Sequence, residues 1–191
     1  MRTKDLNKVE VIFRASLALI RKEGIAGVTM SKLAARAGMA TGTLYIYFRS
    51  KEELLRKLFD KLNQESAVRF MKGYDPGRPL MEGLKQVWMN YLEHRIEHHD
   101  ESIFLEQYYR SPYISGDELQ MAESMKAPVL QMIRRGQQEK VIRADADDEM
   151  LFLAMLGFIR ELADEHISGI YVLDDTRIEK AFQINWEAIR R

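Results

Sequence analysis

Residues 29–54 read TMSKLAARAGMATGTLYIYFRSKEEL, and this stretch decides the fold of the first part of the chain. Thr29 is a residue type that commonly caps a helix N-terminus, because its hydroxyl can accept a hydrogen bond from a free backbone N–H. After Thr29, an apolar stripe at helical spacing is formed by Met30, Leu33, Ala34 and Ala37. Gly38 is predicted to end this helix, because glycine adopts the left-handed turn conformation without strain.

A second short helix is predicted directly after this turn. Thr41 is the expected cap, and Leu44 and Phe48, four residues apart, are expected to face inward. Ser50 and Glu53 have the spacing of a capping box, which predicts the start of the next helix. Two short helices joined by a tight glycine turn are typical of a helix-turn-helix, whose second helix enters the DNA major groove.

The charges of the chain are distributed unevenly along its length. Residues 1–60 contain twelve Lys and Arg against six Asp and Glu, a formal charge of +6, and the remainder balances this to a net charge of zero. A basic N-terminal segment followed by an acidic remainder indicates that the N-terminal segment binds phosphate groups. Chance segregation of solvated charges gives the same pattern. The predicted DNA contacts are Thr29, Ser31, Lys32, Arg36, Thr41, Gly42, Thr43, Tyr45, Tyr47 and Lys51.

These predicted contacts differ in what they can recognise. Gly42 lets the backbone approach DNA closely, and Thr43 can reach a base edge or a thymine methyl group. For Tyr45 and Tyr47 the alternative role is packing inside the small domain. The second helix has none of the Arg, Lys, Asn and Gln side chains that usually read bases. We therefore expect affinity to depend mainly on phosphate contacts, with sequence read partly through apolar contact and DNA shape.

The order of these motifs resembles the DNA-binding domain of the TetR (tetracycline repressor) family of bacterial regulators over residues 6–55. The matching segments are Val28-Thr29 through Ala37-Gly38, Thr41 through Tyr45, Tyr47-Phe48 and Ser50 through Leu54. The resemblance implies a transcriptional regulator, most commonly a repressor, that a small-molecule effector releases from a palindromic double-stranded DNA operator. It also implies a homodimer whose last two helices form a four-helix bundle with the partner.

The rest of the chain also predicts helices, so the expected fold class is all-α. An apolar stripe from Val9 to Ile20 predicts a first helix that ends at Gly24. Pro128 is expected to kink or split the helix that contains it. The other predicted helices cover about 51–72, 79–99, 101–110, 117–139, 146–168 and 175–190.

We expect two domains in this all-helical chain. Residues 1–50 are predicted to form a three-helix DNA-binding domain, and 51–191 a helical ligand-binding and dimerisation domain. The helix at about 51–72 is expected to bridge the two, because the turn-rich residues 74–79 follow it.

The middle of the chain is rich in aromatic and methionine side chains, which suit an adaptable apolar pocket but are equally common in an ordinary core. The candidate ligand-binding residues are Trp88, Tyr91, Phe104, Tyr108 and Met125. Near the C-terminus, small and apolar residues share one helical face, with packing inside one chain as the alternative role. The candidate dimer-interface residues are Leu153, Ala154, Gly157, Phe158, Ile178, Phe182 and Trp186.

Other function classes have little support in the sequence. The chain has no apolar run near the length of a membrane span, which favours a cytoplasmic protein. It has no cysteine and no nucleophile or phosphate-loop motif, so we expect no enzymatic activity and no cofactor. His94 and His98 lie four residues apart, but without a third ligand at a diagnostic spacing we interpret them as a solvated, polar helix end and predict no metal site. The remaining alternative is a helical small-molecule-binding or interaction protein without DNA activity.

Overall fold

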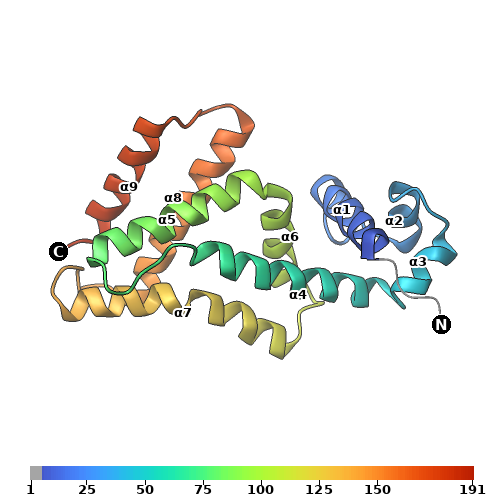
Figure 1. Ribbon diagram of the computed structural model, residues 1–191, viewed down its shortest axis with the longest axis horizontal. Helices are drawn as coiled ribbons and strands as arrows, with labels where there is room; N and C mark the ends of the chain where they lie inside the picture. Colours follow the sequence, from blue (N-terminus) through green and yellow to red (C-terminus); the bar gives the residue numbers. More distant parts are fainter. Residues whose placement is uncertain (1–5) are drawn as a thin grey trace. The chain divides into compact units, whose positions relative to one another are not determined.

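A computed structural model describes residues 6–191, and across them the secondary structure is helical apart from one isolated β-bridge between Ile142 and Arg190 (Figure 1). The helix order supports the predicted all-α class. The helices are α1 (Leu6–Glu23), α2 (Met30–Arg36), α3 (Thr41–Tyr47), α4 (Lys51–Phe70), α5 (Leu80–Glu97), α6 (His99–Tyr109), α7 (Gly116–Gln138), α8 (Asp148–Ser168) and α9 (Asp175–Ile189).

The described chain folds into two compact units that are not contiguous in sequence. The first unit, called the head here, contains residues 6–65 and 99–122, and the second, called the body, contains 66–98 and 123–191. The head therefore includes α6 and the first turns of α7, in addition to α1–α3 and most of α4. This compact grouping differs from a division after residue 50, because α6 packs against α1 rather than within the body.

The core of the head contains residues that are distant from one another in sequence. Ile12 and Ile20 of α1 are fully buried. The helix ends at Glu23, and the next residue, Gly24, has a φ of +71°, which suits the glycine predicted to end it. Phe104 of α6 is also fully buried in this core. The side chain of Gln107 accepts a hydrogen bond from the backbone N–H of Ile25 at 2.8 Å, which ties α6 to the loop after α1.

The first turn of α7 is fixed within the head by a buried carboxylate. Glu118 and Ser115 form a capping box, in which the Ser115 N–H donates to Glu118 at 2.7 Å. The Tyr108 hydroxyl also donates to Glu118, at 2.9 Å. Burial disfavours the charged form, but these hydrogen bonds from Ser115 and Tyr108 outweigh it and lower the pKa of Glu118. The carboxylate therefore stays ionised and links α6 to α7.

The body is built around α5, which packs against α8 and α9. Trp88 of α5 is buried and donates its indole N–H to Asn185 of α9 at 2.9 Å, and its ring meets Phe182 edge-on. Helix α7 runs from Gly116 to Gln138 with Pro128 inside it, so of the predicted kink or split the split does not occur. Across residues 6–191, we find no helix that combines the length and the apolar character needed to cross a bilayer.

His94 lies near the end of α5 and is buried, with 3 % of its surface exposed, so the prediction of a solvated helix end is wrong at this residue. Its ring meets Phe70 edge-on and stacks on His98, because the turn of α5 that carries it faces the body core. Burial, with smaller contributions from His98, Arg69 and Arg95, lowers the pKa of His94 to about 3. His94 is therefore neutral in the folded protein at neutral pH.

We predict that the free energy of unfolding decreases as the pH falls from 7 to 5. In the unfolded chain His94 binds a proton below its ordinary pKa of 6.5, whereas the folded protein does not bind it until about pH 3. This one group is expected to destabilise the folded protein by about 2 kcal/mol over that interval. Urea unfolding followed by circular dichroism at several pH values measures the effect.

His94→Gln should remove this part of the pH dependence, because glutamine does not titrate. Ser66→Ala is the matched control, since Ser66 Oγ lies 3.4 Å from His94 Nε2 and its removal leaves the titrating ring in place. An unchanged slope in His94→Gln would contradict the assignment.

Candidate nucleic-acid interface

Helix α2 begins as the sequence predicts. Thr29 has an extended backbone, and its hydroxyl oxygen accepts a hydrogen bond from the Lys32 N–H at 3.3 Å. Leu33 and Ala34 of α2 are buried in the head core. Gly38 follows the helix with a φ of +67°, a conformation that strains other residues, so the predicted glycine turn between α2 and α3 is confirmed.

Helix α3 begins one residue earlier than a Thr41 cap would allow. Ala40 is the N-cap and has no side-chain hydrogen bond, so the prediction that Thr41 caps the helix is wrong. The reason is that the Ala40 carbonyl already accepts the N–H groups of Thr43 and Leu44, at 2.9 and 3.3 Å, which makes Thr41 the first helical residue. The Thr41 side chain is therefore not committed to this cap and remains half-buried at the helix start.

The start of α4 is fixed by a capping box in a variant form. Ser50 Oγ accepts the Glu53 N–H at 3.2 Å, as predicted, and the Glu53 carboxylate accepts from the Arg49 N–H at 2.7 Å instead of from Ser50. The Lys57 ammonium, 2.8 Å away, and the Arg49 amide lower the pKa of Glu53 to about 2. Glu53 therefore stays anionic at physiological pH and holds the α3–α4 connection in place.

The residues predicted to contact DNA surround the α2–α3 turn, but they differ in exposure. Lys32 is exposed, yet its ammonium donates to Glu23 at 2.6 Å and to the Gly27 carbonyl at 3.1 Å. Lys51 lies over the Tyr113 ring, with Nζ 5.0 Å from the ring centroid. The other exposed members are Thr29, Ser31, Arg36, Gly42 and Tyr45, and Thr43 is half-buried.

Tyr47 belongs to the head core, whereas its neighbour Ile46 does not. Tyr47 is 8 % exposed and packs among the buried residues of the head, which is the alternative role that the sequence left open. Ile46 is 60 % exposed, and sequence reasoning did not select it. The helical spacing could have indicated this exposure. Leu44, Tyr47 and Phe48 lie on the buried side of the short helix, so position 46 lies on the other side.

The candidate ligand-binding residues do not come together in one place. Phe104 and Tyr108 belong to the head core, because α6 packs there, whereas Trp88 and Tyr91 belong to the body. Tyr91 is half-buried, and its hydroxyl accepts a hydrogen bond from Arg160 Nε at 3.3 Å. Met125 is also half-buried and lies in the body part of α7.

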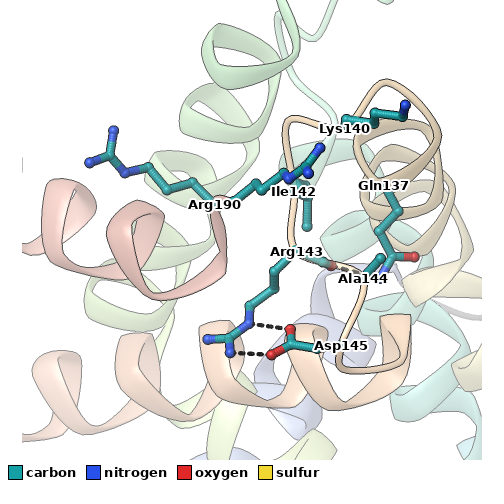
Figure 2. Close-up of a pocket in the computed structure, with 8 residues that line it drawn as sticks. Gln137, Lys140, Ile142, Arg143, Ala144, Asp145 and Arg190 are labelled. Carbon is teal, nitrogen blue, oxygen red and sulfur yellow. Dashed lines mark hydrogen bonds and ion pairs between the residues drawn. The ribbon is translucent and has the colours of Figure 1, made fainter.

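One open depression in the body has a volume of about 760 Å³ and involves none of these candidates. It lies between the α7–α8 connection and the end of α9, and Lys140 and Arg190 contribute to its lining (Figure 2). Two of its lining residues, Arg143 and Asp145, make a two-pronged ion pair with both contacts at 2.6 Å. Within residues 6–191 we find no group of three or more His, Cys, Asp or Glu side chains arranged to hold a metal ion.

The candidate dimer residues divide into an exposed set and a buried set. On α8, Leu153 is 61 % exposed, and Ala154 and Gly157 are exposed beside it. Phe158 and Ile178 are half-buried. Phe182 and Trp186 are buried within the body, since Phe182 packs against the Trp88 ring. Ile184 is a large apolar residue of α9 that is 52 % exposed, and sequence reasoning missed it.

Two family models together cover most of the chain. Residues 12–58 match the bacterial regulatory proteins of the tetR family, and residues 79–190 match the tetracyclin repressor-like C-terminal domain. A helix-turn-helix transcriptional regulator of Haemophilus influenzae is 26% identical over 191 residues, which is 100% of both chains.

Solved structures of similar proteins cover nearly the whole length. A TetR family transcription regulator from Marinobacter aquaeolei has a TM-score of 0.86 and 25% identity, covering 100% of this chain and 99% of that one. A TetR family protein from Vibrio parahaemolyticus has a TM-score of 0.78 and 28% identity, covering 96% and 99% respectively.

We predict that Lys51→Ala weakens binding to every DNA duplex by a similar factor. A lysine that neutralises a phosphate releases a counterion, so its loss should reduce the slope of log K against log salt by about 0.9 per protomer. Fluorescence anisotropy with labelled duplexes at several salt concentrations measures both quantities. Thr43→Ala is the comparison variant and should change the preference between duplexes while leaving the salt slope intact. Identical effects of the two variants would contradict this division.

Proposed function

Because the protein belongs to the TetR family of bacterial regulators, we propose that it is a repressor released from its DNA operator by a small-molecule effector. The main support for DNA binding is the exposed surface of α3. This helix follows the turn at Gly38, and the basic residues Arg36 and Arg49 precede and follow it in the sequence. We assign DNA binding to residues 1–50, and ligand binding and dimerisation to 51–191. In this proposal α6 supports the head without contacting DNA.

The contacts that we propose for DNA binding separate into two kinds. Thr29, at the N-terminus of α2, and Lys51, at the N-terminus of α4, are suited to phosphate oxygens, because helix N-termini and ammonium groups both attract anions. Gly42, Thr43 and Tyr45 are exposed or half-exposed on α3 and are suited to the major groove. Lys32 contributes less directly in this scheme, because its ammonium already binds Glu23.

We also propose that α8 and α9 form the surface of a homodimer. The support is an exposed apolar face on α8, where Met150 and Leu153 are 60 % and 61 % exposed. A Cβ added at Gly157 would meet nothing within 4 Å, so a partner helix can approach closely there. On α9, Ile184 is also exposed, at 52 %. Two heads held by such a dimer would suit a palindromic operator, because a two-fold protein matches two-fold DNA.

The effector is expected to bind the body, since most of this unit lies within residues 79–190, which match the C-terminal domain of the family. Tyr91 and Met125 are the candidates that remain half-buried in the body, and Trp88 lies deeper. Helix α4 contributes residues to both units without interruption. An effector that favours a different arrangement of α4 would therefore change the population of heads able to bind DNA.

Substitution of Leu153 by Arg should convert the proposed dimer to a monomer. Burying a guanidinium without a partner costs several kcal/mol, and two-fold symmetry would bury one such group from each protomer. Light scattering at micromolar concentration measures the mass. Val68→Arg is the matched control, because Val68 is 75 % exposed on α4 and lies outside the proposed interface. A dimeric Leu153→Arg protein would exclude this face as the interface.

The function as a whole is tested by selection from a random pool of DNA duplexes. We expect the protein to enrich an inverted repeat, to bind it with an affinity that decreases with salt, and to release it when the correct compound from a metabolite collection is added. A scrambled duplex of the same composition is the control. If no sequence is enriched and salt has no effect, the alternative of a helical binding protein without DNA activity is favoured.

A further inference from the structure

Ile46 is the exposed aliphatic side chain of α3, next to Tyr45, which is 51 % exposed. Ile46 is 60 % exposed, whereas Leu44 of the same helix is fully buried and Tyr47 is 8 % exposed. Single exposed apolar residues are common on protein surfaces, and Val68 is another example. Ile46 differs in its place on α3, the helix that the proposed function puts in the major groove, and this place points to an intermolecular role.

The position of Ile46 directs its side chain toward the beginning of α3. In an α-helix the Cα–Cβ bond tilts toward the N-terminus, so a side chain covers the surface over the residues three and four positions before it. For Ile46 these residues are Thr43 and Gly42. Gly42 has no side chain that could cover this surface, and the space around a Cβ added there is open. Ile46 is itself 60 % exposed, so its methyl groups are available to a partner.

The surroundings of Ile46 favour nucleic acid over an apolar protein partner. Arg36 and Arg49 are exposed and precede and follow α3 in the sequence. The +6 charge of residues 1–60 attracts anions such as DNA phosphates and repels cations. Inside the major groove, the apolar feature that a base presents is the C5-methyl group of thymine. An aliphatic side chain in that groove is therefore complementary to thymine.

We propose that Ile46, exposed on α3, contacts a thymine C5-methyl group in each half of the operator and determines base preference there. This inference rests on the proposed DNA-binding function and adds a specificity-determining residue to it. Burial of one methyl group contributes about fourfold in affinity per half-site, and therefore about fifteenfold when both half-sites are changed.

The test combines a change in the protein with a change in the DNA. A duplex enriched by the full-length protein from a random pool is resynthesised with each thymine replaced in turn, in both half-sites, by deoxyuridine, which removes only the methyl group. We expect one position at which wild-type protein loses about fifteenfold in affinity. Ile46→Ala should bind the unmodified duplex about fifteenfold more weakly and be indifferent to deoxyuridine at that position.

Two further variants separate this contact from general effects. Ile46→Val should keep most of the sensitivity to the methyl group, because valine retains a branched aliphatic side chain. Val68→Ala removes an exposed aliphatic side chain elsewhere, on α4, and should bind like wild type. The melting temperature of Ile46→Ala should match that of wild type, because the residue is exposed.

The outcomes distinguish the possible failures. If wild-type protein tolerates deoxyuridine at every position, or if Ile46→Ala and deoxyuridine have additive effects, the proposed contact is overturned. The first of these results needs no variant and so does not depend on the folding of one. If no duplex is enriched at all, the DNA-binding function fails, which is a separate result.

Discussion

The head depends on how a seven-residue helix is kept folded. A helix as short as α3 is not stable in water by itself, so its conformation has to come from tertiary packing. Burial of Leu44 and Phe48 supplies this packing, and the positive φ at Gly38 sets the direction in which α3 leaves α2. Once the buried side is fixed, the exposed side is fixed as well. The surface available to DNA is thus a consequence of the core beneath it.

Features that depend on neighbouring residues were predictable from the sequence. The Thr29 cap, the turns at Gly24 and Gly38 and the Ser50 cap are confirmed, because each is a local hydrogen bond or backbone conformation. The Thr41 cap was predicted wrongly, since residue type alone does not identify which carbonyl accepts the first helical bond. The DNA contacts themselves stay a prediction.

Features that depend on distant contacts could not be read from the sequence. Phe104 looks equally suitable for a pocket or a core, and only the packing of α6 against α1 assigns it to the head. On α9, Phe182 and Ile184 are two residues apart. Phe182 is buried because it packs against Trp88 of α5 in the same chain, whereas Ile184 is exposed. His94 was misjudged for the same reason, because its neighbours in sequence are polar while its neighbours in space include Phe70.

The membership of α6 in the head has a consequence for building chimeric regulators. The hydrogen bond from Ile25 to Gln107 and the burial of Phe104 mean that a segment ending after α3 or α4 leaves part of its core behind. Grafting this head onto another sensor would require three junctions in the gene, one in α4 and one at each end of residues 99–122. Head exchange between such proteins is therefore constrained by tertiary structure as well as by the order of motifs along the chain.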